Sequence, residues 1–244
     1  MQVIYKTHWR NMHLQTQQHN KLELALRQQC SLLTFLTPTI DEQWFSSQCL
    51  TSKQLTDLAN AIKLRGANVT EGYVAINLYL QLNWQVIYLL VACVEQLGCI
   101  PDLVNIKQRV TGSHIYGLAN LNIMAQQDSF NNADLIELAA NHLFDHQQAW
   151  YNNVPLQYRL NKGLLKRLQS DTFHAALIAC WPDKSIKFIA KRFQPWQKLC
   201  GKHRFSDQNN KLTFMRKTCC LHYQLVAADY CANCPLNKKG TSAC

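Results

Sequence analysis

The stretch EGYVAINLYLQLNWQVIYLLVACVEQLG, residues 71–98, decides the fold of this chain because it is the most apolar part of the sequence. Its longest unbroken apolar run has nine residues, 86–94, whereas a membrane-spanning helix needs roughly 20. Polar amides interrupt the stretch at Asn77, Gln81, Asn83 and Gln85. We therefore predict a helix buried in the protein core, ended by Gly98 and Pro101, and no transmembrane segment.

Further helices are predicted on both sides of this stretch by the helical spacing of apolar residues. They cover residues 16–36, 52–65, 132–150, 161–180 and 184–194. Residues 103–124 alternate by twos around a Thr-Gly-Ser turn and predict a β-hairpin, and residues 211–218 fit a short strand. The predicted fold class is α+β, mainly α, with a small antiparallel β element. We place a mainly helical body at residues 1–200 and a C-terminal subdomain at residues 201–244.

Charge is distributed unevenly along the chain. Residues 1–150 hold 9 basic and 11 acidic side chains, a balance of −2, whereas residues 151–244 hold 16 and 4, a balance of +12. A segment this basic is typical of proteins that face an anion: nucleic acid, a membrane surface, an acidic protein, or an anionic group held by the chain itself. The alternative without a binding role is a solvated basic face that keeps the protein soluble.

Four of the 11 cysteines fall within sixteen residues, as Cys219-Cys220 and Cys231-Ala-Asn-Cys234. The N-terminus has no apolar block followed by a cleavage site, so we expect a cytosolic protein with reduced thiols, in which clustered cysteines are metal ligands. Neighbouring cysteines diverge, which suits a two-iron cluster better than one zinc ion, although a structural zinc site stays an alternative. Packing explains the other seven, and most clearly Cys93 and Cys180. These seven are Cys30, Cys49, Cys93, Cys99, Cys180, Cys200 and Cys244.

Phosphate-binding glycine loops are missing from the sequence. The eight glycines form neither G-x-G-x-x-G nor G-x-x-x-x-G-K-[ST], so a nucleotide or flavin site of those types is not supported. No G-x-S-x-G or H-E-x-x-H motif occurs either. If the chain holds a redox centre, we therefore expect it to need an external electron carrier.

The segment FMRKTCCLHYQLVAADYCANCPL, residues 214–236, resembles the C-terminal signature of the FhuF-type ferric siderophore reductases. That signature is Cys-Cys-x10-Cys-x2-Cys with basic residues before it and Pro-Leu after it. The matching positions are Arg216, Lys217, Cys219, Cys220, Tyr223, Cys231, Cys234, Pro235 and Leu236. The resemblance implies a [2Fe–2S] cluster on the four cysteines, which makes residues 201–244 an iron–sulfur subdomain. It also implies an oxidoreductase that passes one electron to a ferric siderophore of the hydroxamate type and releases Fe(II) for iron assimilation, with ferredoxin or another reductase as donor.

A basic and aromatic dock for the ferric complex is expected near the cluster, because Arg and Trp together suit planar, partly anionic ligands. The candidates are Arg192, Trp196, Lys198, Lys202, Arg204, Arg216 and Lys217. His222, two residues after Cys220, is a candidate proton donor. The basic segment would also favour the reduced cluster and attract an acidic partner.

Two further hypotheses compete with the reductase. One is a zinc-stabilised basic nucleic-acid-binding module, which the resemblance argues against. The other is a siderophore-binding protein whose cluster is only structural. With the reductase as the preferred hypothesis, we expect no nucleic-acid partner and a cytoplasmic location, with peripheral association with the inner membrane as an option.

Overall fold

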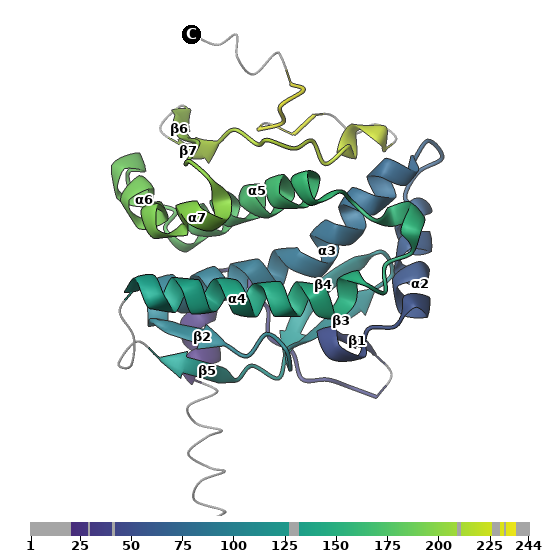
Figure 1. Ribbon diagram of the computed structural model, residues 1–244, viewed down its shortest axis with the longest axis horizontal. Helices are drawn as coiled ribbons and strands as arrows, with labels where there is room; N and C mark the ends of the chain where they lie inside the picture. Colours follow the sequence, from purple (N-terminus) through teal and green to yellow (C-terminus); the bar gives the residue numbers. More distant parts are fainter. Residues whose placement is uncertain are drawn as a thin grey trace, which may run out of the picture.

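The structure is a computed structural model, in which residues 21–28, 30–40, 42–126, 132–208, 211–225, 230–231 and 233–237 are described. Helix α3, Glu71–Ala92, runs through the middle of it (Figure 1) and continues as a π-helical segment, Cys93–Leu97. The Thr70 hydroxyl caps α3 by accepting the N–H of Tyr73, and Gly98 ends it at φ 60°, a left-handed conformation that glycine adopts without strain. The predicted core helix is confirmed.

Length and composition alone would let the helical span Glu71–Leu97 cross a membrane. However, 83% of its most apolar window is buried inside the structure. Core helices of globular proteins meet the same length and composition criteria, so this span is weak support for a membrane segment.

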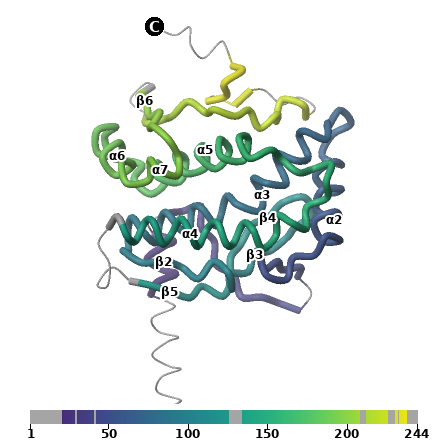
Figure 2. Tube along the Cα trace, viewed as in Figure 1, coloured from purple at the N-terminus to yellow at the C-terminus, as the bar shows by residue number. Residues whose placement is uncertain are grey.

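Of the other described helices, four lie close to their predicted positions, and the short α7 was not predicted. α5 packs along α3, and the tube in Figure 2 follows the chain from one helix to the next. Their bounds are α2 Ser52–Lys63, α4 Asn132–Tyr151, α5 Lys162–Cys180, α6 Ile186–Phe193 and α7 Gln197–Cys200. The predicted helix over 16–36 falls partly outside the described residues, and its described part is helical over 21–28.

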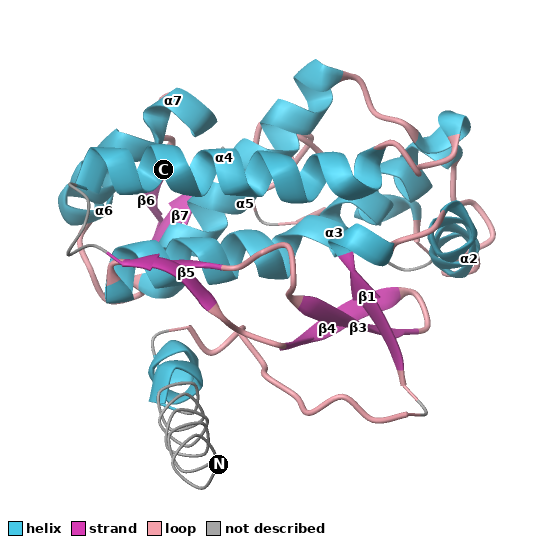
Figure 3. Cartoon of the chain, turned by 60° about the horizontal axis from the view of Figure 1, so that its bottom comes forward, coloured by secondary structure: helices cyan, strands magenta, loops and turns pink. Residues whose placement is uncertain are grey.

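Three small antiparallel sheets lie within the part of the chain that the structure describes, and Figure 3 shows them against the helices. The predicted hairpin is formed by β3, Lys107–Thr111, and β4, His114–Ala119; β1, Gln43–Ser46, joins it in the order β1-β3-β4. β2, Cys99–Pro101, pairs with β5, Ile123–Gln126. β6, Phe205–Gln208, pairs with β7, Lys211–Phe214. The α+β, mainly α fold class is confirmed, although the sequence analysis did not predict β1, β2 and β6.

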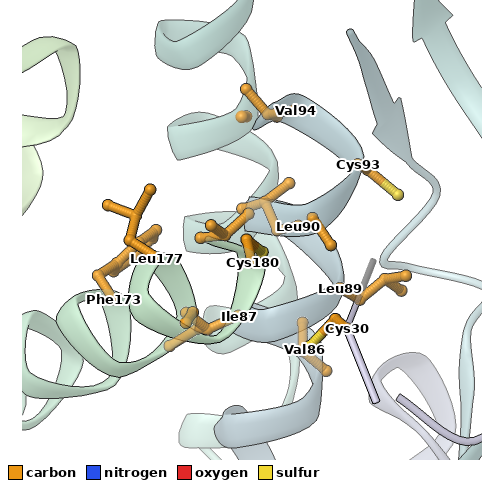
Figure 4. Close-up of a cluster of buried hydrophobic side chains, with 14 of the residues drawn as sticks. Cys30, Val86, Ile87, Leu89, Leu90, Cys93, Val94, Phe173, Leu177 and Cys180 are labelled. Carbon is orange, nitrogen blue, oxygen red and sulfur yellow. The ribbon is translucent and has the colours of Figure 1, made fainter. Parts of the chain in front are cut away.

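The apolar side chains buried among the described residues form two groups, and α3 contributes to both. Figure 4 shows part of the larger group, where Cys93 and Cys180 lie among residues such as Leu90 and Phe173. Their predicted role in packing is confirmed. Cys30, Cys99 and Cys200 are also buried, Cys49 is exposed, and Cys244 lies outside the described residues.

The β6–β7 hairpin packs on the helical body rather than around a core of its own. Phe205 and Phe214 belong to the same core group as Phe173 and Phe193. This packing fixes the position of the chain that leaves β7 toward the cysteines. The predicted boundary between residues 200 and 201 stays a prediction.

Candidate metal centre

The chain that leaves β7 runs across α5 and the N-terminal part of α3, at one edge of the molecule (Figure 1). It first carries Cys219-Cys220, and the later Cys231–Cys234 turn comes back beside it. The N–H of Arg216 donates to the carbonyl oxygen of Asn233 at 3.2 Å, and the N–H of Cys234 donates to that of Cys231 at 2.9 Å. The first bond brings the two cysteine pairs of the sequence together, and the second closes the Cys231–Cys234 turn.

The four sulfurs meet as two close pairs, each joining one cysteine from Cys219-Cys220 to one from Cys231–Cys234. The Sγ atoms of Cys219 and Cys234 are 3.5 Å apart, and those of Cys220 and Cys231 are 3.7 Å apart. Two thiolates on one tetrahedral metal, with bonds of about 2.3 Å, lie about 3.8 Å apart. Each pair therefore has the spacing for one metal atom. No group of three or more metal-ligating side chains among the described residues has the arrangement to hold a single ion.

An unusual backbone conformation follows the adjacent cysteines. Leu221 has a φ of 59°, and its N–H points at Cys219 Sγ, 3.3 Å away. The left-handed region is strained for a residue with a branched apolar side chain, and such residues concentrate at functional sites. A hydrogen bond to sulfur is a common way in which proteins stabilise a metal-bound thiolate.

The grouped thiols resist ionisation without a cation among them. Burial is the largest cause that raises the pKa of Cys219 to about 11; the Leu221 N–H lowers this pKa, and the neighbouring Cys234 and Cys220 contribute to the rise. Burial and Cys220 also raise the pKa of Cys231, which the Arg216 guanidinium partly opposes. Since a metal centre supplies the missing positive charge, this donor set fits an iron–sulfur cluster better than free thiols.

Two buried residues that the sequence analysis did not single out contact the cysteine segment. Asp171 of α5 accepts the backbone N–H groups of Lys217 and Thr218, and Asn77 of α3 donates to the carbonyl oxygen of Cys220. A signal for Asp171 existed in the sequence, because it is one of only 4 acidic residues in the basic segment 151–244. Asn77 was noted only as an interruption of an apolar helix.

The predicted dock is only partly available to a ligand. Trp196 is fully buried, and its indole N–H donates to Glu95 at 2.8 Å, so the structure contradicts its surface role. Arg192 pairs with the same carboxylate at 2.6 Å, and Arg204 pairs with Asp171 at 2.9 Å. The aromatic residue fills the core and the two arginines neutralise buried acids.

The three lysines among the dock candidates keep free surface. Lys198, Lys202 and Lys217 are exposed, whereas the Arg216 side chain is 16% exposed and lies 3.9 Å from Asp171. The predicted proton donor His222 is exposed on a short 3-10 helix, His222–Gln224.

Aromatic surface beside the cysteines comes from two tyrosines. Tyr223 and Tyr230 are 36% and 46% exposed, and their ring centroids are 5.0 Å apart. Tyr223 lies three residues after Cys220 and Tyr230 directly precedes Cys231, so the rings flank the sulfur pairs along the chain.

Comparison with known families identifies the same segment. The family described as the FhuF 2Fe-2S C-terminal domain matches residues 216–236. Neither the curated proteins nor the solved structures give a significant match to the chain. The match covers the Cys-Cys pair, the Cys-x-x-Cys turn and the loop between them, and it agrees with the resemblance found in the sequence. Residues 216–236 thus match the FhuF 2Fe-2S C-terminal domain, and this match supports a [2Fe–2S] cluster in the segment.

Proposed function

We propose that this protein is a cytoplasmic ferric siderophore reductase whose cluster is held by Cys219, Cys220, Cys231 and Cys234. The observation that carries the proposal is the pairing of the four sulfurs at 3.5 and 3.7 Å within the matched segment. When bound, the cluster supplies single electrons. One electron converts Fe(III), which hard oxygen donors hold tightly, into Fe(II), which they hold weakly, so the metal is released without hydrolysis of the ligand.

Solvent access at the cysteines supports electron transfer to a partner from outside. Cys219, Cys220 and Cys231 are partly exposed, whereas Cys234 is buried. The Cys220–Cys231 pair is therefore nearer to solvent than the other pair. Arg216 lies close enough to Cys231 to lower its pKa, and a cation at that place favours the reduced, more negative form of the centre.

The binding surface for the ferric complex combines charge and aromatic area. Lys217 and Arg216 supply positive charge just before the first cysteine pair, and Tyr223 and Tyr230 supply exposed rings. We propose that an anionic ferric hydroxamate binds over this surface and that His222 gives a proton to a donor oxygen as the metal leaves. Electrons come from an external donor such as a ferredoxin, which is drawn by the same positive charge.

Stopped-flow mixing tests the reaction directly. Protein reduced by dithionite, with the excess removed, is mixed anaerobically with a ferric trihydroxamate and a chelator that colours with Fe(II). We expect reoxidation of the visible spectrum with one Fe(II) trapped per cluster. The gallium(III) complex has the same shape and charge but accepts no electron, so it must leave the protein reduced. Absence of reoxidation by the ferric complex would refute the reductase.

Ligand assignment needs a separate test. Cys231→Ser is expected to lose or strongly alter the visible absorption and the electron paramagnetic resonance (EPR) spectrum of the centre, together with iron and sulfide content. Cys49→Ser, at an exposed cysteine outside the matched segment, is the control and should keep both. Wild-type protein with one tightly bound zinc and no iron would instead support the structural zinc site.

A further inference from the structure

The backbone that carries Cys219 and Cys220 is held from two helices by buried polar side chains. Asp171 of α5 is 2% exposed, and its carboxylate accepts the N–H of Lys217 at 2.9 and 3.1 Å and that of Thr218 at 2.9 Å. Asn77 of α3 is 8% exposed and donates to the carbonyl oxygen of Cys220 at 3.2 Å. The two contacts lie on either side of Cys219.

We propose that Asp171 and Asn77 are positioning residues for the iron–sulfur cluster. They fix the backbone of residues 217–220 so that Cys219 and Cys220 direct their sulfurs to different partners, Cys234 and Cys231. The inference deepens the proposed function and rests on the four-cysteine ligand set given there.

Burying the Asp171 carboxylate costs desolvation free energy, and its contacts show what it does for the fold. A buried carboxylate loses its hydration and needs both cations and hydrogen-bond donors around it. Arg204 at 2.9 Å supplies the closest cation, while two of the donors are backbone N–H groups directly before the cysteines. The chain beyond β7 is irregular, so these N–H groups have no strand partner, and a side chain must accept them.

Asn77 has a close comparison on its own helix. Asn77 and Asn83 both donate to the carbonyl oxygen four residues earlier in α3, at 3.0 and 2.8 Å. Of the two, only Asn77 makes a second hydrogen bond, to the cysteine segment. The side-chain Oδ1 of Asn83 instead accepts from Gln147 of α4 at 2.8 Å. The pair therefore separates the effect of a buried amide on this helix from an effect on the cluster.

Adjacent cysteines need such support because their sulfur positions depend on backbone angles over three residues. Leu221 at φ 59° is part of that conformation and is held against its own preference. With an anchor removed, the chain relaxes toward ordinary angles and the Cys219 and Cys220 sulfurs move relative to their partners. The cluster is then held less firmly and its ligand geometry changes, which spectroscopy detects without any substrate.

The first test compares two buried carboxylates. Asp171→Asn keeps the side-chain size but replaces one acceptor oxygen by an NH2 group. Glu95→Gln is the matched control, because Glu95 is also buried and paired with an arginine, at 2.6 Å, in the π-helical segment. On full-length protein with its cluster, we expect Asp171→Asn to shift the EPR g values and to lose iron to a chelator several-fold faster. Glu95→Gln should match wild type in both, even where it lowers thermal stability.

The second test uses the asparagine pair, and it tests the positioning role by itself if Asp171→Asn fails to fold. Asn77→Ala is expected to change the EPR spectrum and speed iron loss, and Asn83→Ala is expected to change neither. Equal behaviour of Asn77→Ala and Asn83→Ala, or of Asp171→Asn and Glu95→Gln, would overturn the inference. Wild-type protein that holds the cluster but leaves a ferric hydroxamate unreduced would refute the reductase and leave the positioning role standing.

Discussion

Two buried histidines should make the stability of this protein fall steeply between pH 6.5 and pH 4. His146 of α4 is 1% exposed and His174 of α5 is fully buried. In each ring Nδ1 donates to a backbone carbonyl, that of Leu103 at 2.9 Å and that of Ser170 at 2.7 Å. Each Nε2 is buried and has no hydrogen-bond partner among the described residues, so protonation would create a charged N–H in apolar surroundings.

The size of the effect follows from the pKa values of the two folded-state imidazoles. Burial lowers the pKa of His146 to about 4, and burial likewise lowers that of His174 to about 4, with Arg204 and Lys217 adding to it. The unfolded chain binds a proton near pH 6.5 and the folded chain does not, so stability falls as the pH drops below 6.5 and levels off below about 4. For His146 the loss is about 2 kcal/mol at pH 5 and about 3 kcal/mol at the plateau.

Urea denaturation at pH 7.0, 6.0 and 5.0, under anaerobic conditions, measures this loss. The variants His146→Asn and His174→Asn place an amide nitrogen near the former Nδ1 position and cannot titrate. Each should flatten the pH dependence by about 2 kcal/mol between pH 7 and 5, whatever its absolute stability. Comparison with wild type cancels any contribution from the cluster. Variants with the wild-type slope would show that the histidines are not buried in the neutral form, and would refute the reasoning.

Three further perturbations test other parts of the structure. Glu95→Ala leaves a half-exposed arginine and a buried indole N–H without their acceptor, so it should cost about 3 kcal/mol in urea denaturation, and a cost below about 1 kcal/mol would contradict the buried ion pair. Arg216→Gln removes positive charge beside the cysteines and should lower the midpoint potential by something on the order of tens of millivolts. Arg109→Gln, on the distant β3 strand, should leave the potential unchanged, and equal shifts would argue against a local effect. Gly117→Ala should cost about 2 kcal/mol because φ is +110° and the new Cβ would meet a leucine side chain at 2.4 Å, whereas Gly112→Ala, at φ +57° with open space, should cost about 1 kcal/mol; equal costs would rule out the clash.

Short strands were the part of the fold that sequence patterns missed. β1 pairs with β3 about sixty residues further along the chain, and the four residues of β1 carry no alternation that would mark them. Such a strand exists because a partner edge is available, which is a property of the assembled sheet. The β3–β4 hairpin was predictable because its turn and its alternation lie within one short segment.

Two side chains that were predicted to line the ligand dock make contacts inside the protein instead. Trp196 was predicted to line a surface dock but fills the core beside Phe173, with ring centroids 5.2 Å apart. Arg204 was predicted to meet a ligand but neutralises Asp171. Composition shows that a segment is basic and aromatic, but burial depends on which face of the short helices and hairpin turns inward.

The sequence by itself determined the central helix and the identity of the metal-binding segment. A long apolar stretch can satisfy its backbone and bury its side chains in few other ways, and four cysteines at this spacing are a local chemical pattern. Only the tertiary structure decided that Cys219 lies by Cys234 and Cys220 by Cys231, and that α3 and α5 hold the segment through Asn77 and Asp171. Those relations join residues far apart in the chain, and they arise from packing rather than from any local preference.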